Sequence, residues 1–375
     1  MVISLYHVNA PALDEPGYGA FDALHLSSAE AGHAILLSTD DRFMKRAARR
    51  WLAARSSLEP GKMPSTRCGM LCRYMSNLRA IATRCLTAGL LAAAACYGQL
   101  PLTGVIDIHV HSDPDSLPRR IDAIDLARLA KKRGMRALVL KNHYESTASL
   151  AWLVRKVVPG IEIFGGIDLN LTVGGINPAA VERMTMMKGG WGRVVWMPTF
   201  DAENQVRFSK QERPFVSVSK DGKLLPAVQQ VIALVAQHQL TLETGHSSAE
   251  EGLMIIREAR QQGVQHIVVT HALIAPVRMT IPQMQEAARD GAYLEFVYNG
   301  LIGPSKEYEI GDYAKAIRAV GPPSCILSSD LGQPVNPLHP DGLVAFFAAL
   351  KKVGFTQSEI DQMSKTNPAR ALGLP

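Results

Sequence analysis

The sequence predicts a (β/α)8 TIM-like barrel over residues 101–375, preceded by an irregular, partly helical N-terminal extension. Short apolar runs alternate in this segment with stretches of helical period, which is typical of βα units around a parallel sheet. Eight such runs fit a barrel, whose usual length is about 250 residues. No glycine-rich phosphate loop follows the first run, so a doubly wound open sheet is the second choice.

The expected strands are short runs of mainly apolar residues, many of them β-branched. In chain order they cover residues 104–111, 136–143, 162–169, 193–199, 240–246, 266–271, 293–297 and 325–330. The expected helices have apolar residues at a spacing of three or four. They cover residues 121–133, 149–157, 225–237, 249–262, 281–290, 312–320 and 341–353.

Side chains that can bind metals stand at the ends of these strands. The first strand ends in His109 and His111 and the second in Lys141 and His143, while later strands end in His246, His271 and Asp330. Active sites of such barrels lie at the C-terminal ends of the strands, so we expect these side chains to converge. His109 and His111 are two residues apart, which places both imidazoles on one face of a strand. Neutral imidazole binds zinc and similar divalent ions.

Residues 106–111, His246, His271 and residues 329–330 together resemble the amidohydrolase superfamily of metal-dependent hydrolases, and residues 367–374 resemble its closing segment. The resemblance covers about residues 101–375. It implies a distorted barrel with one or two divalent ions, zinc first and manganese, iron or nickel as alternatives. It also implies that His109 and His111 bind the more buried ion. His246 and His271 bind the second, or His246 alone joins the first pair. Asp330 binds metal and acts as the general base.

One feature departs from that superfamily. Members with two metals usually have a carboxylated lysine or a glutamate at the end of strand four, and residues 193–199 contain neither. Lys141 is the candidate substitute, since carbamylation would turn it into an anionic bridge. The alternative is a Lys141 ammonium that binds a substrate carboxylate beside the metal. His143 is a further metal ligand or a donor to substrate, and Asp201 is a fallback ligand.

These features predict hydrolysis of an amide, ester, lactone or related bond in a small molecule. A decarboxylase or hydratase on the same barrel is the alternative. We expect further substrate contacts from Asn142, Tyr144, Gln333, Asn336 and His339. We expect Glu243 to be structural, because an offset of three residues from His246 points it to the opposite face of a strand. Glu295 is expected to support the site indirectly. Two roles are open for Asp113, Asp115, Arg119 and Arg120, contact with substrate or a solvated turn, and we prefer the turn.

The N-terminal quarter has a different character. Within an extension over residues 1–66, residues 20–55 resemble part of a PIN-type ribonuclease domain, with Asp22 and Asp40 matching metal-holding carboxylates of that family. An RNase-like or toxin-like fragment is therefore a function from another class. Residues 67–100 are a linker or a signal-like apolar helix. Translation from Met70 or Met75 would predict a periplasmic or secreted protein, and translation of all 375 residues a cytoplasmic one.

Composition excludes several classes of protein. The formal charge is +6, but residues 1–100 hold 11 basic and 7 acidic residues and the rest hold 29 and 27, so we expect no nucleic-acid partner for the barrel. No apolar run reaches the roughly 18–20 residues of a membrane span. Cys325 alone follows residue 100, which excludes a disulfide framework there. The sequence leaves open whether the chain forms a homo-oligomer.

Overall fold

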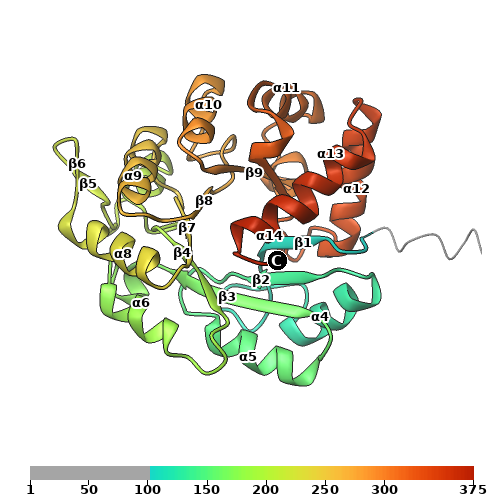
Figure 1. Ribbon diagram of the computed structural model, residues 1–375, viewed down its shortest axis with the longest axis horizontal. Coiled ribbons are helices and arrows are strands. Elements are labelled where there is room, and N and C mark those ends of the chain that lie inside the picture. The colour runs from blue at the N-terminus through green and yellow to red at the C-terminus, as the bar shows by residue number, and fades with distance from the viewer. Residues whose placement is uncertain (1–101) are drawn as a thin grey trace, which may run out of the picture. The chain divides into compact units, whose positions relative to one another are not determined.

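The structure, a computed structural model, describes residues 102–375. Eight parallel strands form one sheet in the order β1-β2-β3-β4-β7-β8-β9-β10, which curves into a nearly closed barrel with helices around it (Figure 1). This confirms the predicted fold. The strands are β1 (Ile106–Val110), β2 (Ala137–Leu140), β3 (Glu162–Asp168), β4 (Gly192–Trp196), β7 (Thr241–Glu243), β8 (His266–Val269), β9 (Tyr293–Val297) and β10 (Cys325–Ser328).

All seven predicted helices are present. They are α4 (Ala123–Lys132), α5 (Ala148–Val157), α8 (Pro226–Gln237), α9 (Ala249–Gln261), α10 (Ile281–Arg289), α11 (Ile310–Val320) and α12 (His339–Lys352). Further elements were not predicted, namely α6 (Pro178–Thr185), α7 (Glu203–Phe208), α13 (Gln357–Asp361), α14 (Asn367–Ala371) and the hairpin of β5 (Ser219–Lys220) and β6 (Lys223–Leu224). Side chains fix several helix starts: Ser248 and Glu251 form a capping box at α9, and Asp122 caps α4.

The strands bury both faces, as expected of a parallel sheet covered by helices. Alternate strand residues such as Leu138, Leu242 and Leu327 belong to the large apolar core shared with the helices. The intervening residues form a second, smaller apolar cluster inside the barrel, to which Val139, Trp196 and seven other strand residues contribute. Polar residues follow this inner cluster towards the C-terminal ends of the strands, where the candidate ligands lie.

β1 and β10 close the barrel at that end. Asp330 N donates to His109 O at 2.9 Å, and His111 N donates to Leu331 O at 3.0 Å. The register of β1 with β2 shifts, because Asp107 pairs with Leu138 whereas Val110 pairs with Leu140. β1 therefore has one more residue than β2 over this stretch, and such a bulge re-aims the side chains that follow it.

The C-terminal segment covers the opposite end of the barrel. Ala369, Ala371 and Leu372 join the inner apolar cluster, and α14 lies against β1 in Figure 1. Thr241 Oγ1 donates to Ala371 O at 2.7 Å, and Asn367 Nδ2 donates to Cys325 O at 2.7 Å. Because these are the first residues of β7 and β10, the segment forms the floor of the barrel, remote from the candidate ligands.

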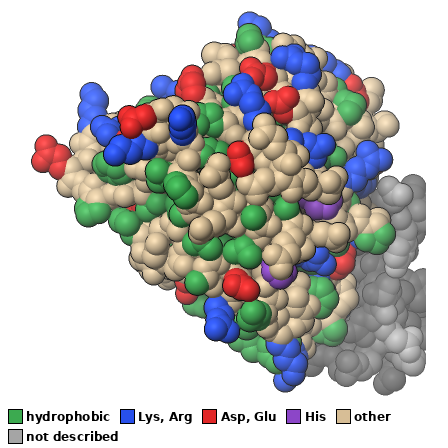
Figure 2. Space-filling view, turned by 60° about the vertical axis from the view of Figure 1, so that its left-hand side comes forward, with side chains coloured by type: hydrophobic (Ala, Val, Ile, Leu, Met, Phe, Trp, Pro, Cys, Tyr) green, Lys and Arg blue, Asp and Glu red, His purple; other side chains and the backbone are tan. Residues whose placement is uncertain are grey.

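Three predictions concern the surface and the ends of the chain. None of the helices within residues 102–375 is long and apolar enough to cross a membrane. On the face in Figure 2, basic and acidic side chains are interspersed. The PIN-like fragment and the signal-like segment lie outside the described residues.

Candidate metal centre

Three predicted ligands meet at the closing edge of the barrel. His109 Nε2 lies 3.2 Å and His111 Nε2 lies 3.1 Å from Asp330 Oδ1. One ligand atom from each residue lies within 4.8 Å of the other two, and all three residues are buried. His109 is on β1, and Asp330 is two residues beyond the end of β10 with a φ of 50°. Such a left-handed conformation turns the chain sharply and directs the carboxylate to the imidazoles.

The other ring nitrogens show how these imidazoles are protonated. His109 Nδ1 lies 3.1 Å from Glu295 Oε1, and His111 Nδ1 lies 2.7 Å from Lys141 O. A carboxylate and a carbonyl only accept hydrogen bonds, so both Nδ1 atoms carry the proton in the neutral rings. Both Nε2 lone pairs then face the same carboxylate oxygen, an arrangement that a divalent cation between them would stabilise. The donor set therefore fits a divalent cation.

Electrostatics agree with this arrangement. Burial raises the pKa of Asp330, but His109 and His111 outweigh it and hold that pKa well below its usual range. Burial lowers the pKa of His111 far more than its hydrogen bond to Asp330 raises it. Burial and Lys141 also lower the pKa of His109, but Asp330 and Glu295 raise it above its usual value. The carboxylate is thus ionised at neutral pH and His111 is neutral, as a metal ligand must be.

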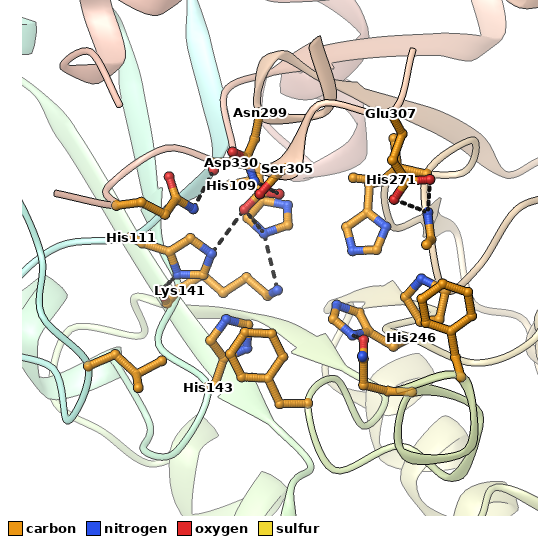
Figure 3. A pocket seen from close by; sticks show the side chains of 18 of the residues that line it. His109, His111, Lys141, His143, His246, His271, Asn299, Ser305, Glu307 and Asp330 are labelled. Carbon is orange, nitrogen blue, oxygen red and sulfur yellow. Dashed lines mark hydrogen bonds and ion pairs between the residues drawn. The ribbon is translucent and has the colours of Figure 1, made fainter. Parts of the chain in front are cut away.

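Two further histidines face this cluster across the cavity (Figure 3). The rings of His246 and His271 lie 4.8 Å apart between centroids, and those of His271 and His109 6.1 Å apart. His246 Nδ1 lies 2.8 Å from Gln205 Oε1, and Nδ1 of His271 is buried without a hydrogen-bond partner among the described residues. Burial lowers the pKa of His271 to about 4, which keeps this ring neutral with a free nitrogen.

Lys141 lies between these two groups of histidines. Its side chain is fully buried and points into the space between them (Figure 3). Nζ lies 3.1 Å from His109 Nε2 and 4.0 Å from Asp168 Oδ2. His143 contacts the same carboxylate, with Nδ1 at 3.3 Å from Asp168 Oδ2 and 2.9 Å from Thr199 Oγ1. Asp201 instead pairs with Arg213 outside this group.

All these ligand candidates line one cavity of about 450 Å³. Of the predicted substrate contacts, Gln333 lines it, whereas Asn142, Tyr144, Asn336 and His339 are not among the lining residues. Asn336 Nδ2 instead donates to Asn299 Oδ1 and Gln333 Oε1, and His339 Nε2 lies 2.7 Å from Leu331 O. Asn142 Nδ2 donates to Pro114 O at 2.8 Å, while the ring of Tyr144 lies 6.4 Å from that of Phe200.

Several residues at the site escaped the sequence analysis. Asp168 ends β3, where the strand-end rule could have found it, and burial raises its pKa to about 7. Asn299 Nδ2 donates to Asp330 Oδ2 at 3.2 Å, but no sequence pattern marks it. The expectation of a solvated turn after β1 was wrong for Asp115 and Arg119, whose side chains are 1% and 5% exposed. Glu295 fits its expected supporting position beside His109.

Glu243 is inside the barrel, contrary to our expectation from its spacing to His246. It pairs in register with Trp196 and Val268, two members of the inner cluster, and is 1% exposed. Thr270 Oγ1 donates to Glu243 Oε2 at 3.0 Å. Burial, followed by the charge of Glu295, raises the pKa of Glu243 to about 8. Glu243 does not line the cavity, so it lies below the candidate ligands.

Comparisons with known proteins identify the family. The model of a family of unknown function, DUF6282, matches residues 104–295, more than half of the chain. The chain belongs to this family. The matched DUF6282 segment runs from the start of β1 to the middle of β9 and so includes every candidate ligand except Asp330. No curated protein matches the sequence.

Solved structures share the fold of this DUF6282 member. The organophosphorus hydrolase from Deinococcus radiodurans is 16% identical with a TM-score of 0.51, over 73% of this chain and 94% of that one. An amidohydrolase from Pseudomonas aeruginosa is 13% identical with a TM-score of 0.52, over 73% and 97%. A mutant PTE-like lactonase from D. radiodurans is 16% identical with a TM-score of 0.52, over 73% and 97%. At these identities the likeness shows a common barrel fold.

Proposed function

We propose that this protein is a metal-dependent hydrolase that cleaves an amide, ester, lactone or related bond in a small molecule. The convergence of His109 Nε2 and His111 Nε2 on Asp330 Oδ1, with both Nδ1 atoms held by acceptors, is the observation that carries the proposal. The fold neighbours that are described as an organophosphorus hydrolase, a lactonase and an amidohydrolase support it.

His109, His111 and Asp330 would hold one divalent ion, with zinc first and manganese, iron or nickel as alternatives. His246 and His271 would hold a second, with His143 as a further ligand or a donor to substrate. A divalent ion supplies Lewis acidity, which makes water a stronger acid and polarises the bond to be cleaved.

Asp330 is the proposed general base. Its Oδ2 accepts a hydrogen bond from Asn299 Nδ2 at 3.2 Å, and Asn299 is held in turn by Asn336 at 2.9 Å. This chain of amides fixes the carboxylate at the cavity, where it accepts the proton of the attacking water and passes it to the leaving group. The low pKa of Asp330 keeps this carboxylate ionised, and so without a proton of its own, at neutral pH.

Lys141 is the proposed bridge between two ions. A fully buried ammonium normally has a close carboxylate partner, but the nearest carboxylate, that of Asp168, is 4.0 Å from Nζ. Attack of the neutral amine on carbon dioxide forms a C–N bond and releases a proton, which leaves a carbamate. This anion would replace the carboxylate that the end of β4 lacks. The alternative is an ammonium that binds a substrate carboxylate.

Elemental analysis of the purified full-length protein, combined with a panel of amide, ester and lactone substrates, tests the proposed function. We expect stoichiometric divalent metal and turnover that chelation abolishes and zinc restores. Incorporation of ¹⁸O from water into the product would support hydrolysis, whereas carbon dioxide release would point to a decarboxylase on the same barrel. Protein without metal, or turnover that a chelator leaves unchanged, would contradict the proposal.

A further inference from the structure

The loop between β1 and α4, residues 112–122, forms one part of the cavity wall and is rigidly held. Its ends are joined, since Asp113 N donates to Ile121 O at 3.0 Å and Ala123 N donates to Asp113 O at 2.8 Å. Arg120 N donates to Gly332 O at 2.9 Å, which ties the loop to the segment after β10. A loop fixed at both ends and along its length holds its side chains in defined positions.

Asp115 organises the interior of this loop. Its Oδ1 accepts from Leu117 N at 3.3 Å, and its Oδ2 lies 2.7 Å from both Nε and Nη2 of Arg119. Both side chains are almost completely buried, at 1% and 5% exposed. Nε is the one atom of this guanidinium with a hydrogen bond among residues 102–375, and Nη2, although close to Asp115, is buried without one. The guanidinium is therefore oriented by Asp115 and keeps one free edge.

The position of Arg119 relates this free edge to the metal centre. Arg119 lines the same cavity as the ligand candidates, together with its neighbours Leu117 and Pro118. A guanidinium in the wall of this cavity faces the same space as a ligand bound beside the ligand candidates.

Other parts of the cavity wall are apolar. Phe200, Phe208, Ile274 and Pro276 line it, and the ring of Phe200 stacks on His143 at 3.8 Å between centroids. A second arginine, Arg278, contacts two of the lining residues without lining the cavity itself, because its guanidinium packs over Phe208 at 5.0 Å and pairs with Glu307 at 3.1 Å. The cavity thus combines one free cationic edge with an apolar surface.

We propose that Arg119 binds a carboxylate of the substrate, so that the substrate is a small monoanion with an apolar body. This inference rests on the proposed function and names the substrate class of the same site. Asp115 already neutralises the single positive charge of Arg119. A singly charged carboxylate therefore suits the free edge of Arg119 better than a doubly charged phosphate. Arg119 is a specificity-determining residue and takes no part in the bond cleavage.

Binding of three matched probes tests the inference. Benzoate, benzamide and phenyl phosphate share a phenyl ring and differ in charge, and their dissociation constants are measured by isothermal titration calorimetry on the full-length protein, with metal and after chelation. We expect benzoate to bind about tenfold or more tightly than benzamide and phenyl phosphate in both states, since a charge-assisted hydrogen bond in a buried site has about this effect. Wild-type protein without that preference would overturn the inference.

The variants locate the carboxylate. Arg119→Met should remove the preference for benzoate, and Arg278→Met, the matched control at the apolar wall, should keep it. Arg119→Met leaves Asp115 buried without its cation, so the double variant Asp115→Asn/Arg119→Met provides a second, charge-balanced test with the same expected loss. A preference that survives both variants but disappears on chelation, or in Lys141→Met, would place the carboxylate on the metal or on Lys141 and overturn the inference. An Arg119-dependent preference in protein that neither binds metal nor hydrolyses would instead contradict the proposed function alone.

Discussion

Nδ1 of His109, on β1, lies 3.1 Å from Oε1 of Glu295, a carboxylate on β9. Glu295 also accepts from Ser328 Oγ at 2.6 Å and from His271 N at 2.8 Å. One buried carboxylate thus orients a ligand on β1 and the backbone of a second ligand after β8. It fixes the tautomer in which His109 Nε2 is free for a metal.

Glu295→Gln should therefore weaken metal binding by about 10–100-fold. The amide oxygen of Gln replaces only one of the two carboxylate oxygens, and the NH2 group in place of the other cannot accept a hydrogen bond from His109 or from His271 N. Competition with a chromophoric chelator measures the affinity. Glu182→Gln, at an exposed position of α6, is the control and should leave it unchanged. Equal affinities for the two variants would contradict the role of Glu295.

Metal binding should stabilise the fold. Free zinc at about 100 times its dissociation constant should raise the free energy of unfolding by about 2.7 kcal/mol, because the ligands converge only in the folded chain. Urea denaturation with and without zinc measures this difference. In Asp330→Asn the increase should be largely lost, whereas Asp221→Asn, at an exposed turn, should retain it. A full response in Asp330→Asn would exclude Asp330 as a ligand.

Lys141→Ala tests the carbamate bridge. If Lys141 bridges two ions, elemental analysis should find two metal equivalents in the wild type and one or none in the variant. A carbonyl signal from ¹³C-bicarbonate, measured by NMR, should also be present only in the wild type. Lys210→Ala at an exposed position is the control. Unchanged stoichiometry would identify Lys141 as an ammonium that contacts substrate.

Gly245→Ala should be strongly destabilising. Gly245 has a φ of 61°, and a Cβ there would lie 2.2 Å from Met197 O and 2.5 Å from Pro198 O. Gly222 has a similar φ of 72° but open space around it, so Gly222→Ala isolates the conformational cost of about 1 kcal/mol. We expect Gly245→Ala to cost about 3 kcal/mol or more in chemical denaturation and to displace His246. Equal losses of unfolding free energy in the two variants would show that the backbone of Met197 and Pro198 moves easily to admit the added Cβ.

The pH dependence of stability should contain a contribution from His339. Burial lowers the pKa of His339 to about 4, compared with the ordinary value of 6.5 for a histidine side chain. The unfolded chain then binds more protons between these values, so the stabilisation is complete above about pH 6.5 and is lost as the pH falls towards 4. His339→Gln can still donate to Leu331 O and should flatten the decline in this window by up to about 3 kcal/mol. Urea denaturation of the wild type and the variant at several pH values measures this difference. If the His339 ring were protonated in the folded protein, the free energy of unfolding of the two proteins would depend on pH in the same way.

The strands and the main candidate ligands were predictable because most strands are short apolar runs with a polar residue at or just after their end. His109, His111 and Asp330 converge as expected, since parallel strands end at the same edge of a barrel. The ends of several strands were placed up to three residues too late. β7 ends at Glu243, and His246 lies in the loop that follows.

That difference explains the error over Glu243. The alternation of faces holds only within a continuous strand, and the chain turns at Gly245 before it reaches His246. Both side chains therefore lie on the inner side of the barrel. Asn299 could not be predicted, because its contact with Asp330 joins loops that are far apart in sequence and carry no periodic pattern. Arg119 was one of the residues for which contact with substrate was considered, but the solvated turn was preferred. Asp168 was within reach of the strand-end rule.

The junction of β1 with β10 has a consequence for biosynthesis. His111 and its partner Asp330 are separated by 219 positions, and the backbone bonds that join their strands form last in chain order. His109 and His111 can contact Asp330 only after the ribosome has synthesised almost the whole barrel. Folding that depends on such distant contacts is slow, and the emerging chain meanwhile exposes apolar strand edges. A metal held by these three residues would therefore bind only after almost the whole barrel has been synthesised.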